Sequence, residues 1–209
     1  MELHYGKVSG NSARAVFAAY ESGLPIDFTL VDTAAGQHQS AAYKAINPMG
    51  KIPSLTDGAF HLWESNAIGL YLVELGPAHH LIPGTAQGRA SMHRWLHFQA
   101  AHVSPPCVPL FRALNEQVKA FWKITPSQHE VEQARRELAR FLPVLDNAVQ
   151  GREWLEEAFS LAEIAFAPHL WMIAQGGFDL SECPALQDWL GRIWARPAWK
   201  QTAALVFGK

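Results

Sequence analysis

The stretch Asn47-Pro48-Met49-Gly50-Lys51-Ile52-Pro53-Ser54-Leu55 decides the fold, together with the stretch Glu64-Ser65-Asn66-Ala67-Ile68 that follows it. The first predicts a turn that leads into a short strand, because a proline cannot donate a hydrogen bond to a sheet and belongs at a strand start or edge. A cis bond before Pro53 would turn the backbone groups of Ile52 toward a ligand. The second stretch predicts a strand over residues 60–63 that runs into a helix capped by Ser65.

The two stretches have complementary chemistry. A helix N-terminus with free N–H groups and the hydroxyl of Ser65 attracts a carboxylate, while Glu64 offers a negative charge to an ammonium group. A carboxylate and an ammonium group together describe the end of an amino acid. Either stretch alone is typical of an ordinary turn or an ordinary capped helix, but the two at this spacing indicate one small-molecule site.

Length and composition limit the class of protein. The chain has 209 residues, 49% of them hydrophobic, and a formal net charge of −2, which predicts a globular protein of one or two domains. The absence of any run of Lys or Arg argues against nucleic acid as a partner. No apolar run approaches the ~18 residues of a membrane span, and the first residues lack the pattern of a secretion signal. Cys107 and Cys183 form no CxxC pair and no metal-spaced cluster, so we expect a cytoplasmic protein without a membrane partner or a metal.

The first part of the chain alternates strand-like and helix-like patterns. Asp57-Gly58 between two apolar runs is a strong turn signal, and Gly76-Pro77 ends the last helix of this part. The order of elements is βαβ followed by ββα, which is typical of a thioredoxin-like domain. The predicted elements are strands over 3–6, 26–31, 53–55 and 60–63 and helices over 13–20, 38–45 and 65–75.

The rest of the chain shows only helical periodicity. Pro105, Pro106 and Pro109 should kink or split its first helix, and Ser160-Leu161-Ala162-Glu163 is a capping box before an apolar run. We therefore predict a thioredoxin-like domain over 1–77, a linker over 78–87 and an all-helical domain over 88–209. The predicted helices cover 89–114, 128–149, 161–173 and 186–195.

Over nearly its whole length the chain resembles the cytosolic glutathione S-transferase family. The resemblance is carried by the two opening stretches, by the capping box and by Arg196-Pro197-Ala198, which looks like the ending of the family's last helix. The resemblance implies that Glu64 binds the α-ammonium of glutathione and Ser65 its α-carboxylate. It also implies that Pro53 is a cis-proline and that the backbone of Ile52 pairs with the cysteinyl part.

The same resemblance implies further partners. Lys51 would face the glycyl carboxylate, and His38 stands where some classes carry a histidine that contacts the same end; an exposed polar residue on a short irregular helix is the alternative for His38. The family is usually a symmetric dimer, so we expect a homodimer. Its second substrate would be an apolar electrophilic small molecule, bound in a pocket of the helical domain.

The catalytic group should lie in the loop over residues 7–12, between the first strand and the first helix. Ser9 stands five residues before Arg14. This resembles the tau- and zeta-like classes, in which the catalytic serine is similarly placed relative to a basic residue of the first helix. Ser9 is therefore our choice for the thiolate stabiliser. Ser12 is the alternative. The structural interpretation of both serines is plain N-capping of the first helix, a role that we expect Ser12 or Asn11 to perform. Tyr5, near the catalytic tyrosine of other classes, is a candidate that could equally be a core aromatic.

Three functions stay open on these residues. The first is transfer of glutathione, as a stabilised thiolate, to the electrophile. The second follows from Ser9-Gly10-Asn11, which resembles the Thr-Pro-Asn stretch of the bacterial nu-like class, in which threonine and asparagine contact the sulfur and disulfides or peroxides are reduced with glutathione. The third is a non-catalytic binding or regulatory protein of the same fold, against which Lys51, Glu64 and Ser65 together argue.

Overall fold

The structure is a computed structural model that describes the backbone of residues 1–209 and every side chain except that of Gln117. It forms two compact units, one of residues 1–82 with 196–209 and one of residues 83–195. These units differ in their bounds from the predicted domains over 1–77 and 88–209, which stay predictions. Across the described residues, no helix is long and apolar enough to cross a membrane.

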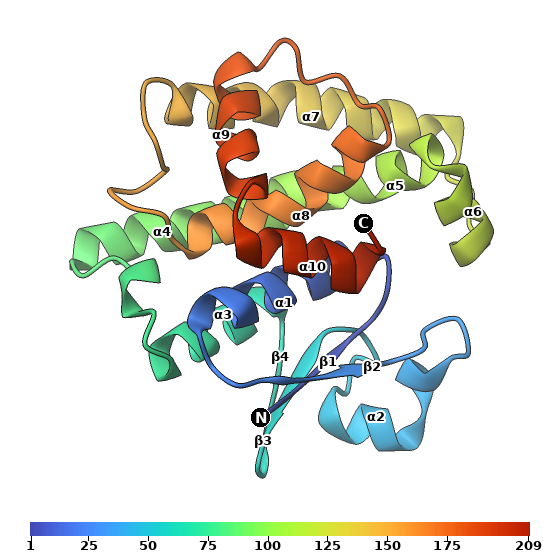
Figure 1. Ribbon diagram of the computed structural model, residues 1–209. Helices are drawn as coiled ribbons and strands as arrows, with labels where there is room; N and C mark the ends of the chain where they lie inside the picture. Colours follow the sequence, from blue (N-terminus) through green and yellow to red (C-terminus); the bar gives the residue numbers. More distant parts are fainter. The chain divides into compact units, whose positions relative to one another are not determined.

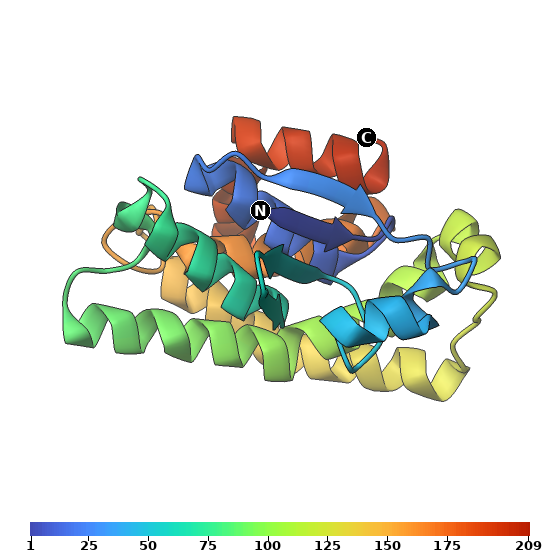
Figure 2. The same ribbon diagram turned by 90° about the horizontal axis from the view of Figure 1, so that it is seen from below.

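The first unit is built on a four-stranded mixed sheet with the strand order β2-β1-β3-β4. Strand β1 is parallel to β2 and antiparallel to β3, and β3 is antiparallel to β4. With one helix after β1, one before β3 and one after β4, this is the thioredoxin-like arrangement that the sequence predicts (Figures 1 and 2). The strands are β1 (Glu2–Tyr5), β2 (Asp27–Leu30), β3 (Ser54–Asp57) and β4 (Phe60–Trp63), and the helices are α1 (Gly10–Ser22), α2 (Ala41–Ile46), α3 (Ser65–Leu75) and α10 (Pro197–Phe207), with 3-10 turns at Gln37–Gln39 and His79–Leu81.

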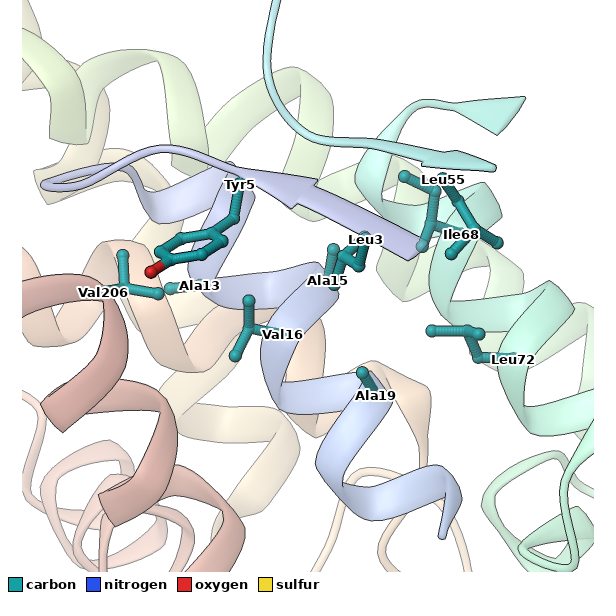
Figure 3. Close-up of a cluster of buried hydrophobic side chains, with 10 residues drawn as sticks. All are labelled: Leu3, Tyr5, Ala13, Ala15, Val16, Ala19, Leu55, Ile68, Leu72 and Val206. Carbon is teal, nitrogen blue, oxygen red and sulfur yellow. The ribbon is translucent and has the colours of Figure 1, made fainter. Parts of the chain in front are cut away.

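Side-chain alternation on β1 separates the two faces of this sheet. Leu3 and Tyr5 are buried in a cluster of apolar residues from the strands and helices of this unit, shown in Figure 3. His4 points the other way, and its ring meets the ring of Tyr43 on α2 edge to face with 6.2 Å between centroids. The cluster consists of Leu3, Tyr5, Ala13, Ala15, Val16, Ala19, Leu55, Ile68, Leu72 and Val206.

The C-terminal helix α10 belongs to this first unit. It packs against α1, and the rings of Phe17 and Trp199 lie 5.4 Å apart. Arg196-Pro197-Ala198 was predicted to mark the ending of the last helix; the preceding helix does end at Trp194, but it is not the last one. Pro197 instead begins a new helix, because a proline at the first helical position gives up only an N–H that has no intrahelical partner.

The second unit is all helical. The predicted split of its first helix is confirmed, because a π-helix over Gln99–Val103 separates α4 from α5. The short α6 that follows α5 was not predicted. Pro105 and Pro106 explain the split, because they lack the N–H groups that a continuous α-helix needs. Helix α8 is its central element, since every residue from Leu161 to Leu170 is buried. The helices are α4 (Ala86–Phe98), α5 (Ser104–Leu114), α6 (Glu116–Trp122), α7 (Gln128–Val149), α8 (Leu161–Gln175) and α9 (Pro184–Trp194).

Candidate functional site

The loop between β1 and α1 presents the hydroxyl of Ser9. Ser9 is the N-cap of α1, with φ −127° and ψ 116°, and its Oγ accepts a hydrogen bond from Ser12 N at 3.2 Å. The interpretation that Asn11 or Ser12 caps this helix was therefore wrong. The capping bond uses a lone pair of Ser9 Oγ and leaves its proton, so the same hydroxyl can donate to an anion, at a helix terminus whose dipole attracts negative charge.

The other hydroxyls of this region face inward. Ser12 has no exposed surface, and its Oγ accepts from Gly6 N at 3.0 Å, which ties the end of β1 to the first turn of α1. Tyr5 is 5% exposed and its ring lies beside Val206 and Ala13 in the apolar cluster (Figure 3). Tyr5 is thus a core aromatic, and Ser9 is the hydroxyl at the surface of the loop.

Helix α10 holds this loop in place. Val8 has φ 54°, which is an outlier for a β-branched residue, and its N–H donates to Val206 O at 3.0 Å. Lys7 Nζ donates to the carbonyl of Leu205 one residue earlier. Such a backbone conformation persists only where its surroundings determine it, so the position of Ser9 depends on the last turns of the chain.

The start of α3 differs from the sequence prediction in one respect. Glu64, and not Ser65, is the N-cap residue, and it has φ 73° and ψ 112° without a side-chain capping bond. Ser65 is already helical and 5% exposed, and its Oγ accepts from Arg14 Nη1 at 2.7 Å. The prediction that Ser65 caps this helix was wrong, because its hydroxyl is turned toward α1.

Arg14 connects two of the predicted segments. The same Nη1 atom that donates to Ser65 also donates to Asn11 Oδ1 at 3.0 Å. Burial lowers the pKa of Arg14 to about 9, and the charge of Glu64 acts in the opposite direction, so the guanidinium is charged at neutral pH. From the sequence, Arg14 was predicted only to mark the position of Ser9, and its own role was missed. Its signal was an arginine inside the apolar run 13–19, where a charge needs partners.

The loop around Lys51 is fixed through its backbone. The Lys51 carbonyl accepts from Tyr43 Oη at 2.8 Å and from Asn47 Nδ2 at 2.6 Å, while the Lys51 side chain is exposed. The peptide bond between Ile52 and Pro53 is cis, as the family resemblance implied. The side chain of Lys51 is therefore available for a ligand, while its carbonyl is held by Tyr43 and Asn47.

His38 lies next to this loop. It occupies the short 3-10 turn before α2, where Gln39 Nε2 donates to Gly50 O at 3.0 Å. A Cβ atom on Gly50 would stand only 3.0 Å from the His38 carbonyl, so the two backbones approach closely. His38 Nδ1 is buried and has no hydrogen-bond partner among the described atoms. The structure thus places His38 beside the loop that carries Lys51.

A close approach at Gly6 joins the loop of Ser9 to Ile52. A Cβ atom at position 6 would lie 2.2 Å from Ile52 Cδ1, so the absence of a side chain on Gly6 makes room for Ile52. With the Arg14 bridge to Ser65, this brings three segments side by side: the loop after β1, the loop before β3 and the start of α3. They carry the predicted site residues Ser9, Asn11, Lys51, Ile52, Pro53, Glu64 and Ser65.

A separate cavity lies within the second unit. It has a volume of about 540 Å³ and is lined by residues between Ala101 and Phe141, among them Arg136 and Arg140. The ring of His102 lies 4.7 Å from that of Phe141 beside it. The predicted glutathione-binding residues all belong to the first unit, whereas every residue that lines this cavity belongs to the second.

This fold and the family descriptions that match the chain define its class. Residues 1–74 match "Glutathione S-transferase, N-terminal domain" and residues 103–197 match "Glutathione S-transferase, C-terminal domain". The chain belongs to the glutathione S-transferase family. The prediction of that family and of its fold is confirmed, and the enzyme is a glutathione transferase.

Individual relatives match along nearly the whole chain. "Glutathione S-transferase 3" of Zea mays is 30% identical over 212 residues, which cover 99% of this chain and 94% of the relative. "Glutathione S-transferase theta-2" of Homo sapiens is 30% identical over 92% of this chain and 80% of its own length. A crystal structure of the theta class glutathione S-transferase from Xanthomonas axonopodis pv. citri, with glutathione bound, has a TM-score of 0.87 at 27% identity and covers 96% of this chain and 95% of that one.

Proposed function

We propose that this glutathione transferase binds glutathione along the three converging segments of its first unit and activates it as a thiolate at Ser9. The Ser9 hydroxyl donates to the sulfur, and the N-terminus of α1 favours its negative charge. Ser65 donates to the α-carboxylate, Glu64 binds the α-ammonium, and the backbone of Ile52 pairs with the cysteinyl part beside Pro53. Lys51 and His38 face the glycyl carboxylate.

The observation that carries this proposal is the state of the Ser9 hydroxyl. Its lone pair serves α1 as a cap while its proton is available, and Ser12, its alternative, is buried with its oxygen facing Gly6. The thiolate then attacks an apolar electrophile: a C–S bond forms, and the leaving group departs with the electron pair of the bond that breaks. A free thiol has a pKa of about 8.5, so the enzyme contributes by lowering that value and by proximity.

The test is ultraviolet difference absorbance of the protein with reduced glutathione, scanned across pH. We expect a saturable thiolate band well below the pKa of the free thiol. Ser65→Ala should abolish binding. Ser9→Ala should still bind glutathione but show the band only near the pKa of the free thiol, and it should lose conjugation of a chlorodinitrobenzene, from which chloride leaves.

A matched control separates the two roles of Ser9. Ser127 caps α7 with its side chain as Ser9 caps α1, but it is exposed and belongs to the second unit. Ser127→Ala should therefore lose a cap, a cost of about 1 kcal/mol, and keep the thiolate band. A Ser9→Ala protein with an unchanged band would overturn the assignment of Ser9, and unchanged affinity in Ser65→Ala would overturn the glutathione site.

A second candidate reaction is supported by Asn11. Its side chain is exposed beside Ser9, and its carbonyl oxygen is held by Arg14, as a nu-like site with a sulfur-contacting asparagine would allow. Glutathione-dependent reduction of a disulfide or peroxide would then be the activity. Loss of activity in Asn11→Ala with little loss in Ser9→Ala would favour this reaction over conjugation.

We also propose that the protein is a homodimer. Strand β4 is an edge of the sheet, and it exposes two large apolar side chains, Phe60 at 47% and Trp63 at 37%. An exposed edge strand with apolar residues is a surface that proteins usually cover. A second copy of the chain is the partner that the family resemblance implies.

A further inference from the structure

Arg14 contacts one residue beside the proposed thiolate position and one residue at the proposed γ-glutamyl position, and it is itself nearly inaccessible. It is 5% exposed and lies in the second turn of α1, between Asn11 of the first turn and Ser65 of α3. A single nitrogen, Nη1, lies 3.0 Å from Asn11 Oδ1 and 2.7 Å from Ser65 Oγ. A guanidinium nitrogen of this kind carries two hydrogens, which is one for each of these acceptors.

The chemistry of arginine determines how both partners are oriented. A guanidinium can only donate hydrogen bonds. Asn11 must therefore turn its carbonyl oxygen to Arg14, which leaves its amide N–H groups facing away. Ser65 must likewise offer a lone pair, which leaves its hydroxyl proton for another acceptor. A neutral side chain with both donors and acceptors at this position would allow either orientation.

We propose that Arg14 is a positioning residue that makes Asn11 and Ser65 present donors, and not acceptors, to bound glutathione. This inference rests on the proposed function. Glutathione has a carboxylate at its γ-glutamyl end and a thiolate at its centre, and both anions require donors. One buried cation thus orients a donor toward the thiolate and a donor toward the γ-glutamyl carboxylate. Glu64 is the neighbouring negative charge of Arg14.

A buried charge with fixed acceptors also stabilises anions electrostatically. In a site with a low dielectric constant, the attraction between charges is stronger than in water. Replacement of Arg14 should therefore weaken glutathione affinity through Ser65 and raise the pH at which bound glutathione ionises. A residue that only supported the packing of α1 against α3 would affect the stability of the fold and leave that ionisation unchanged.

The experiment compares Arg14→Met, Arg14→Lys and wild type by calorimetric titration with glutathione and by the pH dependence of the thiolate band. We expect Arg14→Met to bind at least tenfold more weakly and to show the band at higher pH. Arg14→Lys keeps the charge and should recover part of both, although it lacks the planar fork of the guanidinium. Arg196→Met is the matched control, since it removes a guanidinium bound to Glu21 in the same unit, with nitrogen–oxygen distances of 2.6 and 2.8 Å, and should change neither measurement.

Asn11→Asp tests the orientation itself and does not require Arg14 to be removed. An aspartate can still accept from Arg14, but it replaces the outward amide donor by a carboxylate oxygen. The thiolate band should move to higher pH in this variant. Unchanged affinity and an unchanged band in folded Arg14→Met, or an unchanged band in Asn11→Asp, would overturn the inference.

The outcomes for wild type keep this inference distinct from the proposed function. A wild-type protein that binds glutathione without a thiolate band would overturn thiolate activation, and the affinity of the Arg14 variants would still decide the role of Arg14 at Ser65. A wild-type protein that does not bind glutathione would overturn both.

Discussion

Replacing Glu163 by alanine removes the acceptor for three hydrogen bonds at the start of α8. Glu163 has no exposed surface. One carboxylate oxygen accepts from Leu155 N at 2.7 Å, and the other accepts from Ser160 N at 2.9 Å and from Ser160 Oγ at 2.8 Å. The first bond ties the loop after α7 to α8. The bond from Ser160 N belongs to the capping box that the sequence predicts, and the bond from Ser160 Oγ adds a side-chain contact between the same two residues.

The magnitude follows from the number of donors left without a partner. A buried donor that loses its acceptor costs about 1–3 kcal/mol, so three of them should lower the free energy of unfolding by at least about 3 kcal/mol. That is a large part of the roughly 5–15 kcal/mol that stabilises a typical protein. Glu163→Asp is one methylene shorter. It can still complete the box with Ser160 but cannot reach Leu155, so it should lose only about 1–3 kcal/mol.

The assay is urea unfolding followed by tryptophan fluorescence, with Glu130→Ala as control. Glu130 forms the same kind of capping box with Ser127 on α7, but it is exposed, and water can replace its bonds. We expect Glu130→Ala to change stability much less than Glu163→Ala. A loss below about 1 kcal/mol in Glu163→Ala, or equal losses in the two alanine variants, would refute the reasoning from buried donors.

Two further predictions concern acid stability and assembly. Burial lowers the pKa of His4; the charge of His61 lowers it further, and the charge of Glu2 raises it. His4 therefore binds a proton more readily in the unfolded chain than in the folded protein. The free energy of unfolding should therefore fall as pH drops below about 6.5, by at most about 1.4 kcal/mol per pH unit from this group. Chemical unfolding at pH 7.5 and 5.5 should show a smaller fall in His4→Gln, and an equal fall would exclude this role. In sedimentation velocity, we expect wild type to be dimeric and Trp63→Glu to shift toward monomer. Leu30→Glu on β2, at the opposite edge of the sheet, should stay dimeric. Dimers that persist in Trp63→Glu would exclude β4 as the interface.

Local sequence signals were sufficient for the thioredoxin-like order of the first unit. The turn at Asp57-Gly58 was displaced slightly, because β3 extends to Asp57 and the loop is Gly58-Ala59. The signals failed where a helix depends on contacts made elsewhere. Helix α10 follows a proline that is compatible with either a stop or a start, and what decides is its packing against α1, more than 170 positions earlier in the sequence. No periodicity in residues 197–207 alone could supply that information.

The site shows the same limit at the level of single hydroxyl groups. Ser9, Ser12 and Ser65 have identical side chains near helix starts, and short-range patterns give each of them a capping role. The structure separates them by the donor that reaches each oxygen: Ser12 N for Ser9, Gly6 N for Ser12 and Arg14 for Ser65. Two of these donors lie within six residues, but Arg14 lies 51 positions from Ser65. Whether a hydroxyl can donate to a ligand depends on which group donates to it, so that property becomes predictable only once the helices that carry both groups have been placed together.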